Sequence, residues 1–178
     1  MLETDRFFLR EFEKTDWKAV HAYASREIVS KYQPWGPNTP QETQQYIDDV
    51  LQQQLRQPRT NFTFAVVWKE TGKVIGAGEL SAIDRTNQSG AIGYILHPNY
   101  WRQGIAAEVA LLLLEFGFEE NRLHRIWASC DPQNLGSQKI LEKVGMIKEG
   151  LLRKNLRMKD GWRDSLLYSI LGDEWQKR

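Results

Sequence analysis

Residues 100–110 read Tyr-Trp-Arg-Gln-Gly-Ile-Ala-Ala-Glu-Val-Ala, and this stretch decides how the chain folds. It follows an apolar run over residues 91–96 that predicts a strand, and it begins a helical pattern that continues to about residue 120. The first amides of a helix have no partner inside the helix and point out of its positive end. A strand, a short loop and a helix start therefore predict an anion-binding site here.

The loop itself is built from small residues. Gly104, Ala106 and Ala107 have almost no side chain to block a phosphate that approaches the backbone, and Arg102 can add a charged contact. A Walker loop is excluded because no Gly-Lys-Ser/Thr follows, and a dinucleotide fingerprint is excluded because the three-glycine spacing is absent. The loop thus predicts phosphate binding of another kind.

Residues 101–106 fit the pattern Gln/Arg-x-x-Gly-x-Gly/Ala after their first position, and they resemble the acetyl-CoA pyrophosphate loop of the GNAT N-acetyltransferase superfamily. Trp101 stands where Gln or Arg is usual, and a Trp at this position resembles the branch that contains the ribosomal-protein N-terminal acetyltransferases of RimJ/RimL type. Three further segments resemble the same branch, at residues 4–10, 124–126 and 131–146. The resemblance covers nearly the whole chain in order and is strongest over residues 93–150.

This resemblance implies an α/β protein with a mixed sheet, in a GNAT-like acyl-CoA N-acyltransferase fold. The hydrophobic periodicity agrees, because it gives the order β-α-α-β-β-β-α-β-α-β-β, which requires a mixed sheet with helices on both faces. The predicted strands cover residues 1–12, 61–68, 73–82, 91–96, 125–129, 147–153 and 164–171. The predicted helices begin at residues 15–16, at the capping box and proline of residues 39–42, at the loop, and at Asn134. A length of 178 residues suits one domain, residues 1–178.

Composition excludes several function classes. With 24 basic and 23 acidic residues the formal net charge is +1, which gives no indication of a nucleic-acid partner. The single cysteine, Cys130, cannot form an internal disulfide, so a cytoplasmic location is expected. One cysteine and three scattered histidines offer no metal-ligand spacing, so no metal is expected. The charged start of the chain does not resemble a signal peptide, and no apolar run approaches the ~20 residues of a membrane helix.

The resemblance implies acetyl-CoA as the cosubstrate. Its pyrophosphate is expected on the backbone of the loop residues Arg102, Gln103, Gly104, Ile105, Ala106 and Ala107. Its pantetheine arm is expected along the strand end at Ile95 and Leu96 and on the side chain of Asn134. Two alternatives stay open at this point, because Asn134 can be a plain helix N-cap and Arg102 a solvated surface arginine.

Acetyl transfer to an amine needs a neutral amine, a thioester held beside it, and a group that meets the leaving thiolate. Many GNAT enzymes protonate the thiolate with a tyrosine seven residues beyond the asparagine, where this chain has Leu141. Ser137 is the expected replacement, because the RimJ/RimL branch also carries a serine there, but it can equally be a small residue that packs the first helical turn. Glu79, in an otherwise apolar or small-residue strand, is the expected base, and the alternative is a carboxylate that simply faces solvent.

The expected acceptor is a primary amine, of a protein N-terminus or of a small molecule, and the sequence leaves its identity open. We expect direct attack by this amine rather than an acetyl-enzyme, because no histidine lies near Cys130 in the sequence to activate it. Two other function classes are an acyl-CoA-binding module that has lost catalysis, suggested by the missing tyrosine, and a protein-interaction domain with an incidental loop. The branch often forms homodimers, and seven tryptophans in 178 residues fit that expectation.

Overall fold

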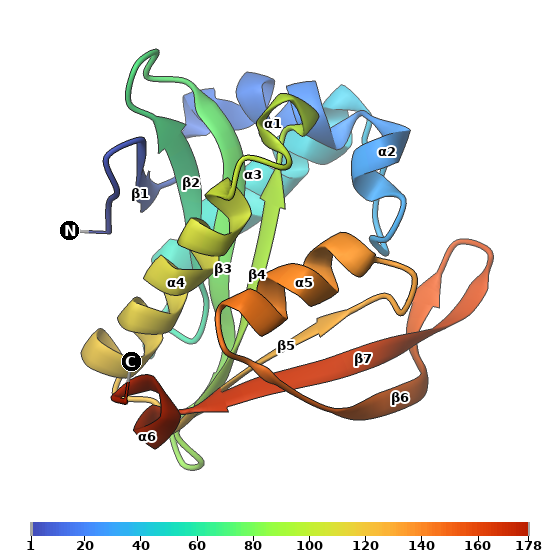
Figure 1. Cartoon of the computed structure of the whole chain (residues 1–178). Helices are drawn as coiled ribbons and strands as arrows, with labels where there is room; N and C mark the ends of the chain where they lie inside the picture. The colour runs from blue at the N-terminus through green and yellow to red at the C-terminus, as the bar shows by residue number, and fades with distance from the viewer. Residues whose placement is uncertain (1, 178) are drawn as a thin grey trace.

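The structure, a computed structural model, describes residues 2–177. Within this part of the chain, seven strands form one sheet in the order β1-β2-β3-β4-β5-β7-β6 (Figure 1). The strands are β1 (Phe7–Glu11), β2 (Phe62–Trp68), β3 (Val74–Asp84), β4 (Ser89–Leu96), β5 (Arg125–Cys130), β6 (Ile147–Met158) and β7 (Gly161–Leu171). The helices are α1 (Trp17–Ala24), α2 (Glu27–Ser30), α3 (Pro40–Gln54), α4 (Ile105–Glu115), α5 (Leu135–Lys143) and α6 (Gly172–Trp175).

The mixed sheet that the sequence predicts is confirmed. β4 and β5 run parallel, and the other neighbouring strands run antiparallel. The predicted order of strands and α-helices is found with two additional α-helices, α2 and α6, whose four residues each are too few to show a periodic pattern. β6 continues to Met158, well beyond the predicted end at residue 153, because its mostly exposed residues give no apolar alternation. β3 reaches Asp84 and β4 begins at Ser89, so the turn between them is shorter than predicted.

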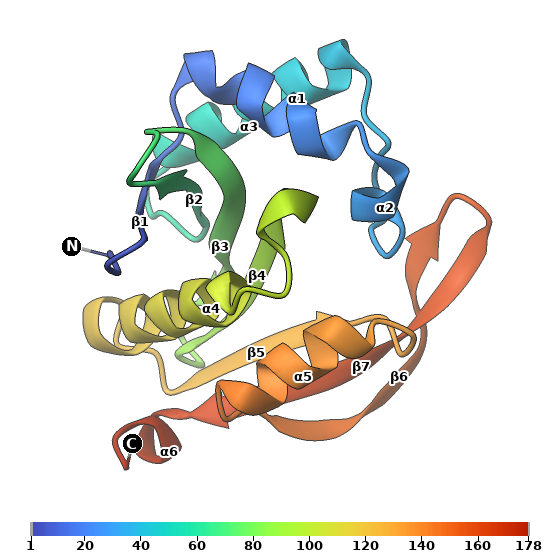
Figure 2. The same cartoon turned by 45° about the horizontal axis from the view of Figure 1, so that its top comes forward.

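Helices cover both faces of the sheet (Figure 2). On one face α1 and α3 pack over β2 and β3, and Val20, Ile47 and Ala65 are buried between these layers. On the other face α4 packs over β3 and β4, and α5 packs over β5 and β6. Each face of the sheet therefore has its own apolar core.

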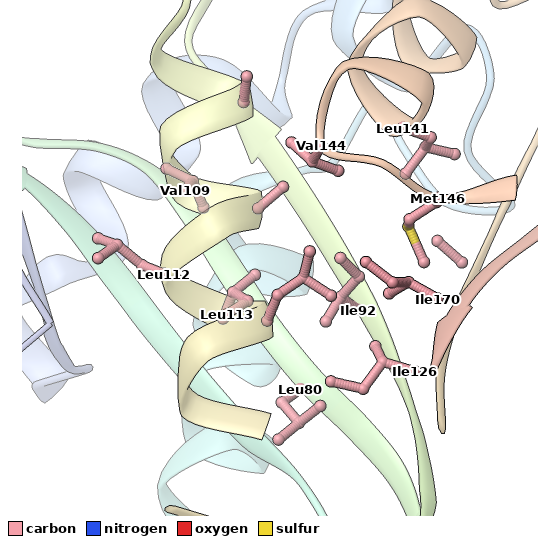
Figure 3. Packing of buried hydrophobic residues seen from close by; sticks show 14 of the residues in the cluster. Leu80, Ile92, Val109, Leu112, Leu113, Ile126, Leu141, Val144, Met146 and Ile170 are labelled. Atoms are coloured by element: carbon pink, nitrogen blue, oxygen red, sulfur yellow. The ribbon is translucent and has the colours of Figure 1, made fainter. Parts of the chain in front are cut away.

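α4 is apolar around most of its circumference, because the sheet lies on one side of it and α5 on another. Figure 3 shows Leu113 of α4 in one cluster with Leu80 and Ile92 of the sheet. Burying an aliphatic side chain of this size contributes about 1.5–3 kcal/mol to stability. A Cβ on Gly78 would lie 2.9 Å from Cγ1 of Val109, so β3 needs a glycine where Val109 of α4 packs against it.

Two helix starts follow directly from the local sequence. The Thr39 hydroxyl accepts a hydrogen bond from the Glu42 amide at 3.2 Å, and the Glu42 carboxylate accepts one from the Thr39 amide at 2.7 Å. This is the predicted capping box at the start of α3. Gly104 is the N-cap of α4 with a φ of +78°, a left-handed conformation that costs glycine far less than any other residue.

The parallel strands β4 and β5 stay together for only a short stretch. Their pairing runs from Ser89 with Arg125 to Ala91 with Trp127. β4 continues to Leu96, so within residues 2–177 its second half has a neighbouring strand, β3, on one side alone. Figure 1 shows the two ribbons separating beyond this point, β4 toward α1 and β5 toward the side that α5 covers.

Candidate functional site

The separated half of β4 offers backbone groups that no strand uses. Along an antiparallel pair of strands, facing residues alternate: in one pair the backbone N–H and C=O groups hydrogen-bond to each other, and in the next pair these groups point away from the partner strand. The amide of His97 donates to the carbonyl of Ile75 at 2.8 Å, so the alternation directs the N–H and C=O of Tyr94 and Leu96 away from β3. The Leu96 carbonyl accepts from the indole N–H of Trp101 at 2.8 Å. The N–H and C=O of Tyr94 and the N–H of Leu96 remain, and they can bind an extended ligand that carries amides.

The loop before α4 presents a row of free amides. Within residues 2–177, the amides of residues 102–106 donate no hydrogen bond, whereas the Ala107 amide donates to the Gly104 carbonyl at 3.1 Å. Gly104 is exposed, and a Cβ added to it would meet one neighbour, the Nη2 atom of Arg6, 3.9 Å away. Unused amides at the positive end of a helix, with open space before them, bind phosphate oxygens. The loop therefore has the geometry that an anion site needs.

Arg6 ties this loop to the segment that precedes β1. Its Nη1 atom donates to the Gln103 carbonyl at 3.0 Å, and its Nη2 atom donates to the Glu108 carboxylate at 2.5 Å. The Gln103 side chain in turn donates to the Asn99 carbonyl at 2.8 Å. Arg102 is exposed, and its guanidinium makes no hydrogen bond or ion pair among the described residues, so it can contact a phosphate. The loop is thus held from behind while its amides stay open.

The start of α5 carries Asn134 and Ser137. The Oδ1 atom of Asn134 accepts from the Ser137 amide at 3.1 Å, which makes Asn134 the helix N-cap. The side-chain NH2 of Asn134 has no partner in the described part of the chain, so the capping role and a contact with a ligand are compatible. The Ser137 hydroxyl oxygen lies 3.2 Å from the phenolic oxygen of Tyr94 on β4, and burial raises the pKa of Tyr94 to about 12.

Glu79 lies on the opposite face of the sheet. Its partner on β4 is Gly93, and a Cβ there would come within 3.0 Å of Oε1 of Glu79, so the carboxylate lies over this glycine. Solvent reaches the Glu79 side chain, yet neighbouring atoms displace enough of its hydration to raise its pKa. Burial, and then the charge of Glu79, raise the pKa of Tyr46 on α3. A solvent-accessible carboxylate with a raised pKa is suited to take a proton from an amine.

Cys130 ends β5 and is buried, with 5% of its surface exposed. Burial raises the pKa of its thiol, which makes it a poor nucleophile. Over residues 2–177, no three His, Cys, Asp or Glu side chains lie close enough together to hold a metal ion. In the same residues, every helix is too short or too polar to cross a bilayer.

The structure places the residues predicted from the sequence in two groups, on opposite faces of the sheet. The loop residues 102–107, Asn134 and Ser137 belong to α4, to α5 or to the segments that lead into them. Glu79 lies on the other face, where the Ile95 side chain packs into the core under α1 and α3. The two groups are connected where β4 and β5 separate. The Leu96 side chain is 3% exposed and faces the core, so only its backbone is available to a ligand.

Two residues of the site are absent from the sequence-based prediction. Arg6 contacts Gln103, which is 97 positions away, and Tyr94 contacts Ser137, which is 43 positions away. Neither belongs to a local motif that carries phosphate or proton chemistry. Only a prediction of which segments lie side by side could have found them.

Comparisons with known proteins bear on the family and the fold of the chain. The family model described as "Acetyltransferase (GNAT) domain" matches residues 6–147. The chain is 34% identical over 176 residues to the uncharacterized N-acetyltransferase YnaD of Bacillus subtilis (strain 168), and the match covers 98% of each protein. A GNAT-family acetyltransferase from Bacillus anthracis has 32% identity and a TM-score of 0.84, with 97% of this chain and 98% of that chain covered. A ribosomal-protein-S5-alanine acetyltransferase from Vibrio fischeri has 28% identity and a TM-score of 0.84, with 97% of each chain covered. On this evidence of sequence and fold, the chain belongs to the GNAT family of acetyltransferases.

Proposed function

We propose that this protein transfers the acetyl group of acetyl-CoA to a primary amine by direct attack of the amine on the thioester. The observation that carries the proposal is the row of free amides at residues 102–106, at the positive end of α4. In the proposed complex these amides and Arg102 bind the pyrophosphate. The pantetheine arm lies along β4 as an added strand and bonds to the outward-directed groups of Tyr94 and Leu96, and the NH2 of Asn134 adds a donor.

The amine approaches from the face that carries Glu79. There the carboxylate takes a proton through water, so that a neutral amine attacks the thioester carbon. A C–N bond forms, the C–S bond breaks with its electron pair on sulfur, and the nitrogen gives up its remaining extra proton to water. Ser137, on the other side of the sheet, donates a hydrogen bond to the departing thiolate. The opening between β4 and β5 is where the two reactants meet.

The acceptor is a peptide N-terminus or a small amine. The name of the Vibrio fischeri relative specifies alanine of ribosomal protein S5, and this supports a peptide N-terminus. Trp35 and Tyr46 are partly buried and pack against the core under α1 and α3, on the face that carries Glu79. These rings supply an apolar wall that suits the first side chain of a peptide.

An acyl-CoA-binding module without catalysis is the second candidate. It is favoured by Leu141, which stands where many GNAT enzymes have the tyrosine that protonates the leaving thiolate. The Leu141 side chain is 1% exposed and has no proton to give. Such a module would bind acetyl-CoA and would never release free thiol.

The two candidates are distinguished by thiol release from acetyl-CoA in the presence of a panel of amines. The panel contains N-terminal peptides, polyamines, amino-sugar antibiotics and free amino acids, and calorimetry with CoA runs in parallel. We expect binding of CoA together with amine-dependent thiol release. Binding without release from any amine would support the second candidate, and the absence of binding would contradict both.

We also propose a homodimer. Large apolar side chains are exposed on β6 and β7, at Ile147, Leu151, Leu152 and Trp162. β6 is an edge strand, and edge strands with apolar side chains commonly pair with another copy. Light scattering should therefore give twice the chain mass of 20.8 kDa, and a monomer mass at working concentration would contradict this.

A further inference from the structure

The contact between Tyr94 and Ser137 has no role yet in the proposed reaction. Tyr94 extends from the half of β4 that lacks β5 as a neighbour, and Ser137 lies in the first turn of α5. Their oxygen atoms are 3.2 Å apart, which is hydrogen-bond distance. The pair therefore bridges the opening through which the thioester would reach the amine.

Each of these two hydroxyl groups carries one hydrogen, and only one of the two can lie between the oxygens. A phenol is a far stronger acid than an aliphatic hydroxyl, so the favoured donor is Tyr94 and the acceptor is Ser137. Burial raises the pKa of Tyr94 to about 12, so the phenol stays protonated at working pH and has a hydrogen to donate. The hydrogen of Ser137 is then free to point elsewhere.

Ser137 has one other polar neighbour that bears on this choice. It is the Cys130 thiol, whose pKa burial raises and Ser137 lowers. A hydroxyl that can rotate between several acceptors is a poor donor to any one of them. With the phenol donating to its oxygen, Ser137 does not use its hydrogen on Tyr94, and that hydrogen is left for a sulfur acceptor.

We infer that Tyr94 is a positioning residue, which donates to Ser137 and so commits the Ser137 hydrogen to the leaving sulfur of CoA. The inference rests on the proposed function. In the reaction the C–S bond breaks with its electron pair on sulfur, and the thiolate accepts the hydrogen bond from Ser137. The ammonium loses two protons on its way to the amide: the first goes to Glu79 through water before attack, and the second goes to solvent water as the tetrahedral intermediate collapses. The thiolate takes its own proton from solvent when CoA leaves. Tyr94 donates its hydrogen bond throughout and is not consumed.

The first test is a double-mutant cycle of Tyr94→Phe, Ser137→Ala and the double variant, with steady-state kinetics for acetyl-CoA and the best amine. Tyr94→Phe and Ser137→Ala should each lower kcat about tenfold, with both KM values nearly unchanged, because the bond to sulfur forms only as the thiolate appears. The double variant should be no slower than Ser137→Ala. Tyr23→Phe removes a phenol that is buried on the opposite face of the sheet, and it should leave kcat unchanged.

A spectroscopic measurement separates positioning from a purely structural role. The absorbance of the CoA thiolate, measured against desulfo-CoA in a Cys130→Ala background, gives the pKa of the bound thiol. The intact pair should hold this pKa below its value in free CoA. Tyr94→Phe and Ser137→Ala should both raise it, whereas lost packing would change thermal stability or CoA affinity instead.

Three outcomes would overturn the inference. They are full activity of Tyr94→Phe, a fold-loss of kcat in the double variant that equals the product of the two single losses, and a bound-thiol pKa that Tyr94→Phe leaves unchanged. If the unaltered protein neither binds CoA nor releases thiol, the proposed function itself fails. If the unaltered protein binds CoA and releases thiol, and Tyr94→Phe has the same kinetics, the proposed function stands and only the inference about Tyr94 is wrong.

Discussion

Replacement of Gly104 by valine tests the cofactor loop most directly. Gly104 has a φ of +78° and an added Cβ would meet no protein atom nearer than 3.9 Å, so steric overlap within the folded protein is not the problem. The cost is conformational, because a residue with a Cβ loses about 1–2 kcal/mol in the left-handed region. A loop that relaxes to relieve this strain turns its amides away from the anion.

The magnitude of the binding loss follows from the number of amides that are displaced. A hydrogen bond to a charged group contributes about 1.5–3 kcal/mol, so losing one of them weakens CoA binding roughly 10- to 150-fold. The strain itself should lower Tm by roughly 2–8 °C in a protein of this size. Calorimetry with CoA and thermal unfolding measure the two effects separately.

Gly72→Val is the matched control. Gly72 also has a positive φ, +66°, and no atom lies within 4 Å of an added Cβ, but it lies in the turn between β2 and β3. It should lose a similar amount of stability and keep the affinity of the unaltered protein. A folded Gly104→Val protein that binds CoA normally, or equal affinity losses in both variants, would refute the reasoning.

Three further predictions follow from the site and its surroundings. Glu79→Gln should lower kcat/KM by at least about tenfold, most strongly below the pKa of the amine, while the exposed Glu119→Gln should have no effect. Because desolvation raises the pKa of Glu79, Glu79→Gln should also raise Tm at pH 7, and this gain should vanish below the ordinary carboxyl value of 4.5; equal kinetics at every pH would contradict a base at this position. Cys130→Ala should keep its activity, and an acetylated Cys130 in mass spectra after incubation with acetyl-CoA alone would overturn direct attack. Glu149→Gln should lower the free energy of unfolding at pH 7 by up to about 1 kcal/mol, because it breaks a partly exposed pair with Arg125. The Arg125 guanidinium lowers the pKa of Glu149 from 4.5 to about 2, so this contribution is present above pH 4.5 and lost as the pH falls toward 2; urea unfolding at pH 7 and pH 3 should show the difference shrinking.

The parts of the fold that the sequence predicts well are those with a local physical cause. The capping box at Thr39 and Glu42 starts α3, and the apolar pattern after Gly104 gives α4. The short helices α2 and α6 were missed because four residues have no period to detect. The full length of β6 was missed because its side chains are mostly exposed, and pairing with β7 rather than apolar alternation sets where it ends.

The same distinction holds within the candidate site. The loop residues could be predicted because the chemistry and the spacing of a phosphate loop are contiguous in sequence. The surroundings of Glu79 could not, because Gly93 and Tyr46 reach it only through sheet pairing and the placement of α3. The partner of Ser137 was missed for the same reason, since Tyr94 meets it across two elements.

The short overlap between β4 and β5 has a consequence for how the molecule opens. Within residues 2–177, three residue pairs, Ser89 to Ala91 with Arg125 to Trp127, join the block of β1–β4 to the block of β5–β7 in the sheet, and the packing of α4 against α5 adds a further connection. In the free protein, the block of β5–β7 should therefore exchange its amide hydrogens through sub-global openings that leave β1–β4 folded. A ligand that lies along β4 would bridge the blocks, so slower deuterium uptake in the parts of β5 and β7 that lie away from the opening should report occupancy without any turnover.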